Sequence, residues 1–279
     1  MNLPKVSVLM TTYNRSKLTA SAIESVLASD FSDFELIISD DGSSDDTYDI
    51  CKSYAAADSR VKVYSNSENL GDYPNRNKVA SYASGKYLKY VDSDDYIYPW
   101  ALGCMVSMME CFPDAGWGLC SMEPNHSRIF PFQLESKEIF RYHYFGSGIF
   151  QRAPLSSIIR REVFESVGGF RSLRMVGDFD MWHRLSLSYP LVLMPQGMVW
   201  YRKHLDQEMT SYRAYLPEYE KILLEHLLSP KCPLDKQEVH LIIFSQKKKL
   251  LRQLLSNFLS LRWRECITSY RMLRPYFSN

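Results

Sequence analysis

The chain has 279 residues, of which 46% are hydrophobic and 23% charged, a composition typical of a globular enzyme. Its formal net charge of +1 gives no reason to expect a nucleic-acid partner. No apolar run approaches the ~18 residues of a membrane-spanning helix, and the first residues do not resemble a signal peptide. The six cysteines form no CxxC pair, so we expect reduced thiols in a cytoplasmic protein rather than a zinc site.

The first half of the chain alternates strand and helix signals. Apolar runs predict strands at 6–10, 34–38, 61–64 and 87–91. Helical periodicity and caps predict helices at 16–29, 45–57, 74–85 and from about 99 to 112. This alternation predicts an α/β fold with a Rossmann-like, mostly parallel sheet flanked by helices. Ligands of such sheets bind at the carboxyl ends of the strands.

Three of the predicted strands end in polar loops, which the crossover rule places at one edge of the sheet. These loops are Thr11-Thr12-Tyr13-Asn14, Asp40-Asp41-Gly42 and Asp92-Ser93-Asp94-Asp95. In an extended segment Asp92 and Asp94 point the same way, toward a ligand, while Ser93 points into the fold. A bound Mg²⁺ or Mn²⁺ would offset the repulsion between the carboxylates and hold a diphosphate. An acidic turn in water is the alternative.

Several segments resemble the inverting family 2 nucleotide-sugar glycosyltransferases, which have the GT-A fold. The resemblance lies in residues 6–15, 34–45, 69–77, 90–95, 156–170, 177–185 and 200–204. It covers roughly residues 4–211 and implies a catalytic domain at 1–211, followed by a helical C-terminal region at 212–279. Two positions depart from the pattern of the family: Asn75 replaces the usual Ala, and Gly177 replaces the usual Glu.

The resemblance implies a nucleotide site. Thr11 and Tyr13 would hold the base, Asp41 would accept a hydrogen bond from it, most often from uracil, and Asp92 would contact the ribose. Further nucleotide-binding residues that the resemblance implies are Asn14, Arg15 and Arg76. An aromatic face suits a base and a carboxylate suits an imide N–H or ribose hydroxyls. Alternatively, Tyr13 packs in the fold and Asp41 stabilises its own turn.

The resemblance also implies a metal and a base. Asp94 would ligate a divalent metal (Mn²⁺ or Mg²⁺) that bridges the phosphates, and His204 would reach the metal or the diphosphate. A loop histidine in water is the alternative for His204. Asp178 takes the position of the catalytic base and is favoured over Asp180, which lies two residues on. Asp178 is also suited to cap a helix, in which case the helix dipole would lower its pKa.

The acceptor side is less defined. Residues 124–153 are aromatic and basic, and Tyr142 and Tyr144 form either an acceptor platform or part of the core. Asp180 and Trp182 are further candidates for acceptor contact. Helices are expected at 220–228 and 239–270, and the second is basic and amphipathic. It suits an anionic membrane surface, or it packs as an appendage on the catalytic domain or on a dimer partner.

The function expected from these residues is metal-dependent, inverting transfer of a sugar from a nucleotide diphosphate sugar, with UDP-sugar favoured. The acceptor would be a hydroxyl of a glycan or a lipid-linked glycan in bacterial surface polysaccharide assembly, at the cytoplasmic face of the membrane. Two alternatives remain. Asp40-Asp41-Gly42-Ser43 is reminiscent of Mg²⁺-dependent phosphatases, and Gly177 would suit a non-catalytic nucleotide-sugar binding module.

Overall fold

The structure, a computed structural model, describes residues 3–123, 125, 127–204 and 208–277. The expected alternation of strands and helices is confirmed in the first half of the chain. Its elements are β1 (Val6–Thr12), α1 (Ser16–Leu27), β2 (Phe34–Asp40), α2 (Thr47–Ala57), β3 (Val61–Ser65), α3 (Asp72–Ser81), β4 (Tyr87–Tyr90), β5 (Tyr96–Ile97) and α4 (Ala101–Glu110).

Shorter strands and a long helical region follow. Their elements are β6 (Trp117–Met122), β7 (Phe132–Leu134), α5 (Ser136–Tyr144), η1 (Pro154–Ser156), β8 (Ser157–Arg160), α6 (Arg161–Ser166), α7 (Gly177–Ser188), β9 (Leu191–Pro195) and β10 (Val199–Trp200). The C-terminal elements are η2 (Glu208–Tyr215), α8 (Leu216–Leu227), α9 (Lys236–Leu259), α10 (Trp263–Leu273) and η3 (Arg274–Phe277).

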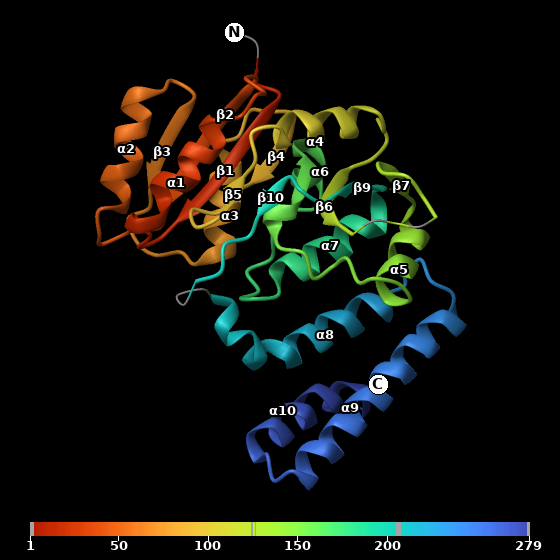
Figure 1. The fold of residues 1–279 in the computed structure, drawn as a ribbon. Helices are drawn as coiled ribbons and strands as arrows, with labels where there is room; N and C mark the ends of the chain where they lie inside the picture. The colour runs from red at the N-terminus through yellow and green to blue at the C-terminus, as the bar shows by residue number, and fades with distance from the viewer. Residues whose placement is uncertain (1–2, 124, 126, 205–207, 278–279) are drawn as a thin grey trace.

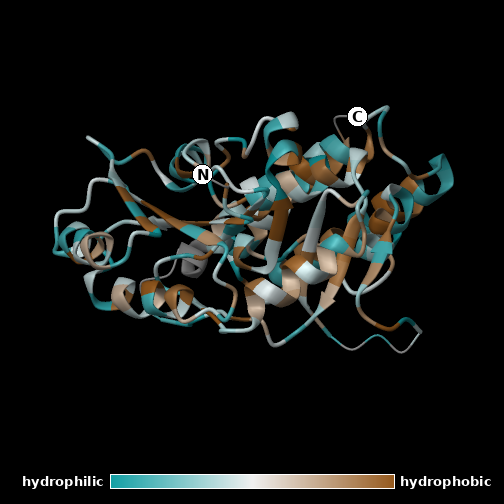
Figure 2. Ribbon diagram, turned by 90° about the horizontal axis from the view of Figure 1, so that it is seen from above, coloured by the Kyte–Doolittle hydropathy of each residue, from teal (hydrophilic) through white to brown (hydrophobic). Residues whose placement is uncertain are grey.

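The main sheet has the strand order β3-β2-β1-β4-β8-β6-β9-β7. The four strands β3, β2, β1 and β4 are parallel, whereas β8 runs antiparallel to both β4 and β6. Helices cover both faces of this sheet (Figures 1 and 2). The parallel half therefore brings the carboxyl ends of β1, β2 and β4 to one edge, as the crossover rule predicts.

Alternating side chains divide the core between the two faces of the sheet. In β2, Leu36 and Ile38 pack in one buried cluster with α1 and α4, while Ile37 packs in the other with α3 and α7. All seven residues of β2 are buried, because the strand has helices on both sides. This double burial explains why the strand is a nearly continuous apolar run up to Ser39 and Asp40.

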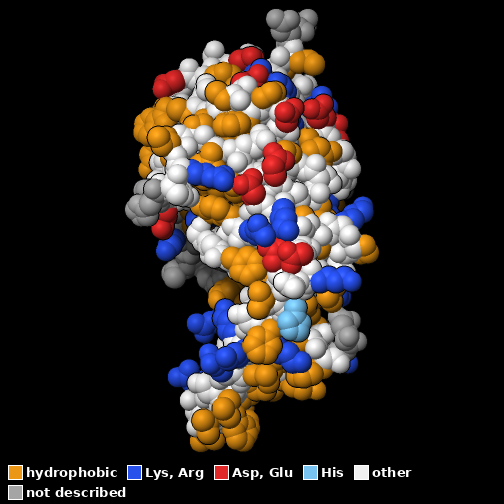
Figure 3. Space-filling view, turned by 90° about the vertical axis from the view of Figure 1, so that its right-hand side faces the viewer, with side chains coloured by type: hydrophobic (Ala, Val, Ile, Leu, Met, Phe, Trp, Pro, Cys, Tyr) orange, Lys and Arg blue, Asp and Glu red, His pale blue; other side chains and the backbone are white. Residues whose placement is uncertain are grey.

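The C-terminal helices differ from the single long helix expected at 239–270. α9 ends at Leu259 and α10 begins at Trp263, with Leu261 at a positive φ of 54° between them. The break lets α10 turn back and bury Met272 and Leu273 against the preceding helices. No glycine or proline marks this turn, so periodicity alone did not reveal it. Lys and Arg lie beside hydrophobic side chains at this end of the molecule (Figure 3).

α8 packs against α7, and Ile222, Leu223 and Leu227 belong to the same buried cluster as the core of the sheet. The division of the chain at residue 211 stays a prediction, but the first helix beyond it packs as part of the same core. Within the described residues, none of the helices combines the length and the apolar character that crossing a bilayer requires.

Candidate active site

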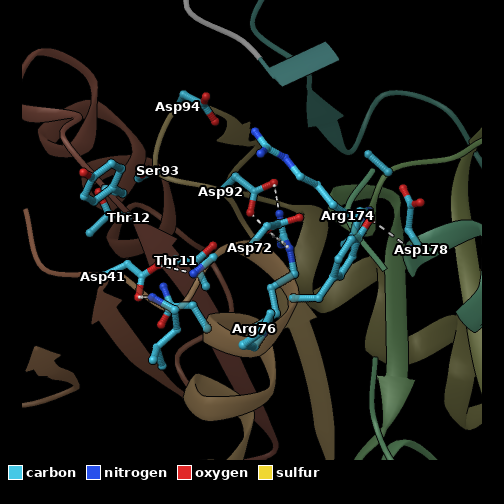
Figure 4. Close-up of a pocket in the computed structure, with 18 of the residues that line it drawn as sticks. Thr11, Thr12, Asp41, Asp72, Arg76, Asp92, Ser93, Asp94, Arg174 and Asp178 are labelled. Atoms are coloured by element: carbon cyan, nitrogen blue, oxygen red, sulfur yellow. Dashed lines mark hydrogen bonds and ion pairs between the residues drawn. The ribbon is translucent and has the colours of Figure 1, made fainter. Parts of the chain in front are cut away.

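A cavity of about 860 Å³ lies at the carboxyl edge of the parallel strands. Figure 4 shows Thr11, Thr12 and Asp41 on one side of it and Asp178 on the other. Asp72, Arg76 and Asp92 lie between the two sides. Of the residues that the sequence predicts for the nucleotide, metal and base, those that line the cavity are Thr11, Tyr13, Asn14, Arg15, Asp41, Arg76, Asp92, Asp94 and Asp178.

The loops after β1 and β2 are fastened to each other beside this cavity. The Asn14 Oδ1 atom accepts a hydrogen bond from the N–H of Ser44 (2.8 Å), and the N–H of Asn14 donates to Ser43 Oγ (2.9 Å). The N–H of Arg15 donates to Thr47 Oγ1 (2.8 Å). Asn14 has a positive φ of 50°, a conformation that asparagine tolerates better than most residues. Asn14 therefore fixes the loop, while the ring of Tyr13 remains 45% exposed at the cavity.

Asp41 holds the segment between β3 and α3 rather than only its own turn. Its carboxylate accepts hydrogen bonds from the backbone N–H groups of Leu70 and Gly71 (both 2.9 Å) and from Asn66 Nδ2 (2.7 Å). Asn66 Nδ2 also reaches Asn75 Oδ1 at 3.0 Å, so the unusual Asn75 belongs to this buried network. Oδ2 of Asp41 receives one of these bonds, from Gly71, and thus retains acceptor capacity toward the cavity.

Arg76 lies between two carboxylates at the floor of the cavity. It is buried, and its Nη1 and Nη2 atoms contact Asp92 Oδ1 and Oδ2 at 2.7 and 2.9 Å. Its Nε atom lies 2.7 Å from Asp72 Oδ1. The Nη2 contact is a hydrogen bond and the Nη1 contact is an ion pair, and together they hold both partners in orientation. Arg76 therefore positions Asp92, and the predicted direct contact of Arg76 with a nucleotide stays a prediction.

The acidic run 92–95 is balanced by residues of the protein itself. Asp94 Oδ2 lies 2.9 Å from His204 Nε2 and 3.6 Å from Arg15 Nε. Asp95 is buried, and burial together with the charges of Asp92 and Asp94 raises the pKa of its carboxyl, which favours the neutral form. As the alternation of the strand predicts, Ser93 is buried. These contacts offset part of the repulsion, and the further contribution expected of a bound metal stays a prediction.

Asp94 and His204 form a donor pair that suits a divalent metal. Within the described part of the chain, no group of three or more His, Cys, Asp or Glu residues makes a complete metal site. Such a complete cage is not required, because Mg²⁺ is commonly held by one or two protein ligands together with substrate phosphates. Imidazole is a ligand that also suits Mn²⁺. The residues present therefore fit a metal that is shared with a diphosphate.

Asp178 lies in the first turn of α7 and faces the cavity. Burial raises the pKa of its carboxyl to about 7, and the nearby Asp72 acts in the same direction. Hydrogen bonds from the N–H of Phe179 and from Tyr73, and the charge of Arg76, oppose this rise. The N-cap residue of α7 is Val176, so the expectation that Asp178 caps the helix with a lowered pKa is wrong. A pKa near neutrality suits a general base.

The candidate acceptor residues lie outside the cavity. Asp180 is fully buried between Arg184, Arg171 and His226, and its hydrogen bonds with His226 and Arg184 hold its pKa at about 2 against the effect of burial. Trp182 is fully buried and stacks on Trp117. These positions correct the expectation that Asp180 and Trp182 contact the acceptor, because neither side chain reaches the cavity.

The two candidate tyrosines of α5 also do not line the cavity. The hydroxyl of Tyr144 lies 2.7 Å from Nε2 of the buried His183. Tyr142 packs against the core, and Asn125 Nδ2 donates to its hydroxyl at 3.4 Å. The contacts of Tyr142 and Tyr144 favour the interpretation that this stretch covers the core, and the acceptor platform stays a prediction.

Sequence reasoning missed four residues that line the cavity: Tyr73, Arg174, Tyr201 and Tyr219. Arg174 comes just before α7 and points into the cavity in Figure 4, next to Met175 with a positive φ of 66°. Tyr219 comes from α8, and its hydroxyl donates to the carbonyl of Met175 at 2.6 Å. The basic segment 171–174 before the candidate base was the one available signal in the sequence.

A sequence model described as glycosyl transferase family 2 matches residues 7–168, more than half of the chain. The chain belongs to this family. EpsE of Bacillus subtilis (strain 168), named as a glycosyltransferase, is 31% identical over 191 residues, which are 65% of this chain and 66% of EpsE. The "GalNAc(5)-diNAcBac-PP-undecaprenol beta-1,3-glucosyltransferase" of Campylobacter jejuni is 37% identical over 105 residues, 37% of this chain and 34% of that enzyme.

The chain thus spans between about a third and two thirds of the length of these curated relatives. Among solved structures, residues 1–349 of TarS from S. aureus in complex with UDP superpose with a TM-score of 0.67 at 19% identity. The superposition covers 98% of this chain and 91% of that one. At this identity the likeness establishes the fold, which is the GT-A fold that the resemblance implied.

The buried Asp180 leads to a prediction about stability. Replacing Asp180 by Ala leaves Arg184 and His226 without their buried partner and should lower the free energy of unfolding by about 3–5 kcal/mol. Arg171→Ala removes a half-exposed partner of the same carboxylate and should cost about 1 kcal/mol or less. Urea unfolding of both variants measures this. An Asp180→Ala protein as stable as wild type, but inactive, would return Asp180 to the acceptor site.

Proposed function

We propose that the protein transfers a sugar from a nucleotide diphosphate sugar, preferably a UDP-sugar, to an acceptor hydroxyl with inversion at the anomeric carbon. The observation that carries the proposal is one cavity, lined also by Tyr13, that has Asp41 on one side, Asp178 on the other and Asp92 between them. The first side offers an aromatic face and carboxylates to a nucleoside. The second offers a carboxylate with a pKa of about 7 to an acceptor.

The nucleoside fits the first side by its chemistry. The half-exposed ring of Tyr13 offers a stacking surface, and Asp41 Oδ2 retains capacity for an imide N–H, which uracil provides. Asp92, held by Arg76, offers carboxylate oxygens to vicinal ribose hydroxyls. Arg174 points into the cavity from the opposite wall, where a guanidinium suits the diphosphate.

Transfer requires the acceptor hydroxyl to lose a proton as its oxygen attacks the anomeric carbon. Asp178 accepts this proton, and the bond from the anomeric carbon to the diphosphate oxygen breaks on the opposite face of the sugar. Asp94 and His204 would hold a divalent metal, which supplies charge neutralisation for the diphosphate when bound. A hydrolase of the paired-carboxylate kind would instead need two acids flanking a water.

The role of Asp178 predicts a pH profile. A base works unprotonated, so kcat should fall as the pH drops through about 7, the pKa of Asp178. Asp178→Asn should bind UDP as wild type does and lose transfer by about 100-fold or more. Asp114→Asn, at an exposed acid outside the cavity, is the control and should change neither. Transfer at the wild-type rate by Asp178→Asn would remove Asp178 from the mechanism.

The role of Asp94 predicts a dependence of nucleotide affinity on metal. Mn²⁺ should tighten the binding of UDP to the wild-type protein by about tenfold or more, equal to about 1.4 kcal/mol. Asp94→Ala should abolish this gain while the protein stays folded, because the carboxylate is a proposed ligand. Calorimetric titration with UDP, with and without Mn²⁺, measures the effect, and Asp114→Ala serves as the control. An undiminished gain in Asp94→Ala would place the metal elsewhere.

The acceptor is proposed to be lipid-linked, and the protein to work at an anionic membrane surface. The Campylobacter relative is named for a diphospho-undecaprenol acceptor, which supports a substrate of this class.

The C-terminal helices support the proposed location at a membrane surface. Hydrophobic side chains exposed along α9, α10 and η3 are Leu241, Phe244, Leu251, Leu255, Phe258, Leu259, Trp263, Ile267, Tyr270 and Phe277. Most of them recur every three or four residues, so each helix carries a second apolar stripe outside the core.

The two stripes meet at the turn between α9 and α10. The rings of Phe258 and Trp263 lie 5.7 Å apart, and Lys247 Nζ lies 3.9 Å from the ring centre of Phe277. Residues 240–277 contain eight Lys or Arg residues but a single acid, Glu265. A two-fold contact with a second copy would bring these like charges together, whereas an anionic bilayer attracts each of them by about 1 kcal/mol. The charge therefore favours lipid.

Binding to vesicles tests this face, which consists of the two stripes and their basic residues. The wild-type protein should sediment with vesicles that contain phosphatidylglycerol, and high salt should weaken binding, whereas phosphatidylcholine alone should not bind it. Phe258→Glu with Trp263→Glu should abolish binding. Ile129→Glu, at an apolar residue that is 92% exposed elsewhere, is the matched control and should not. Self-association of the wild type that the double variant abolishes, without lipid binding, would assign the face to a second copy.

A further inference from the structure

Tyr73, which lines the cavity, packs directly on Gly177. Tyr73 is the second residue of α3 and is 5% exposed, and Gly177 opens α7. A Cβ atom built on Gly177 would lie 2.7–2.8 Å from Cδ2, Cε2 and Cζ of the Tyr73 ring. The φ of Gly177 is not in the positive range, so space rather than backbone conformation requires the glycine. The ring of Tyr73 therefore occupies the volume of a side chain at 177.

The hydroxyl of Tyr73 reaches the candidate base. The backbone N–H of Asp178 donates to Tyr73 Oη at 3.1 Å. This N–H is one of the first N–H groups of α7, which have no partner within the helix, and the N-cap residue Val176 offers no side-chain cap. Tyr73 thus satisfies the backbone of the residue whose carboxylate faces the cavity. Its ring is held in turn by Phe170, with ring centres 5.3 Å apart.

We propose that Tyr73 is a positioning residue for Asp178. Its ring fills the space that a side chain at 177 would need, and its hydroxyl accepts the hydrogen bond from the backbone N–H of Asp178. Tyr73 and Gly177 together are called the steric unit. This inference rests on the proposed role of Asp178. The groups that face Asp178 are Tyr73, Asp72 and Arg76 from α3, Tyr219 from α8 and Arg174 from the preceding loop. Tyr73 differs from the others in that it bonds the backbone of Asp178.

Tyr73→Phe removes the hydroxyl and keeps the ring, so the fold should survive. The variant loses a hydrogen bond that lowers the pKa of Asp178, so the midpoint of the pH profile of kcat should move to higher pH. We expect kcat to fall by about tenfold, the size of one hydrogen bond, with little change in KM for the nucleotide sugar. Unchanged kcat and an unchanged midpoint would overturn the positioning role.

The steric unit is tested by a double-mutant cycle. Gly177→Ala should lower kcat by about tenfold or more in the wild-type background, because the added methyl group collides with the ring. In the Tyr73→Ala background the same change should cost about twofold or less, since the ring is gone. Equal losses in both backgrounds would overturn the coupling. Thermal unfolding of each variant separates misfolding from lost positioning.

Failure of this inference is distinguishable from failure of the proposed function. If Asp178→Asn loses transfer while Tyr73→Phe keeps the wild-type kcat and pH midpoint, Asp178 is the base and the inference about Tyr73 is wrong. If Asp178→Asn transfers sugar at the wild-type rate, the proposed function of Asp178 fails first, and the inference about Tyr73 falls with it.

Discussion

The buried guanidinium of Arg76 is the interaction on which the cavity depends. It binds both oxygens of Asp92 and one of Asp72, and so places a fixed positive charge among several carboxylates. Without it, Asp72 and Asp92 would repel each other, and the charged form of each would be costly in a partly buried site. Arg76 also reaches toward both halves of the site, because its charge lowers the pKa of Asp178. Arg76 thus links the proposed nucleotide side of the cavity, at Asp92, electrostatically to the proposed base, Asp178.

The parallel strands supply the geometry and the loops supply its rigidity. β1, β2 and β4 deliver Thr11, Asp41 and Asp92 to one edge of the sheet, and hydrogen bonds that the side chains of Asp41 and Asn14 accept hold the loops there. The opposite wall contains Met175 and Asp178, which come more than 100 residues after Tyr73 of α3. Asp178 is hydrogen-bonded to Tyr73, and Met175 is hydrogen-bonded to Tyr219 of α8. Because these segments are far apart in the chain, the site forms only when they are packed together. α8 takes part in this packing and therefore belongs with the core.

The sequence predicted the elements of the first half because alternating apolar strands and capped helices are local signals. It also predicted that Asp41, Asp92 and Asp94 share a sheet edge, because topology alone requires this. The resemblance favoured Asp178 as the base, but the sequence did not predict that Asp180 turns inward, since a carboxylate at either position suits a helix start. The contact of Tyr73 with Gly177 was equally hidden, because it depends on the packing of α3 against α7. The turn at Leu261 contains no glycine or proline, so the sequence has no local signal that predicts it.

The central claim is that a nucleotide diphosphate binds in the cavity between the β-strand ends and α7. Hydrogen exchange of backbone amides, with and without saturating UDP and Mn²⁺, tests this most directly. The account predicts slower exchange in residues 11–15, 69–76 and 92–95, with the edge strand β7 unchanged. Protection confined to other parts of the chain, or none at a saturating concentration of UDP, would contradict it.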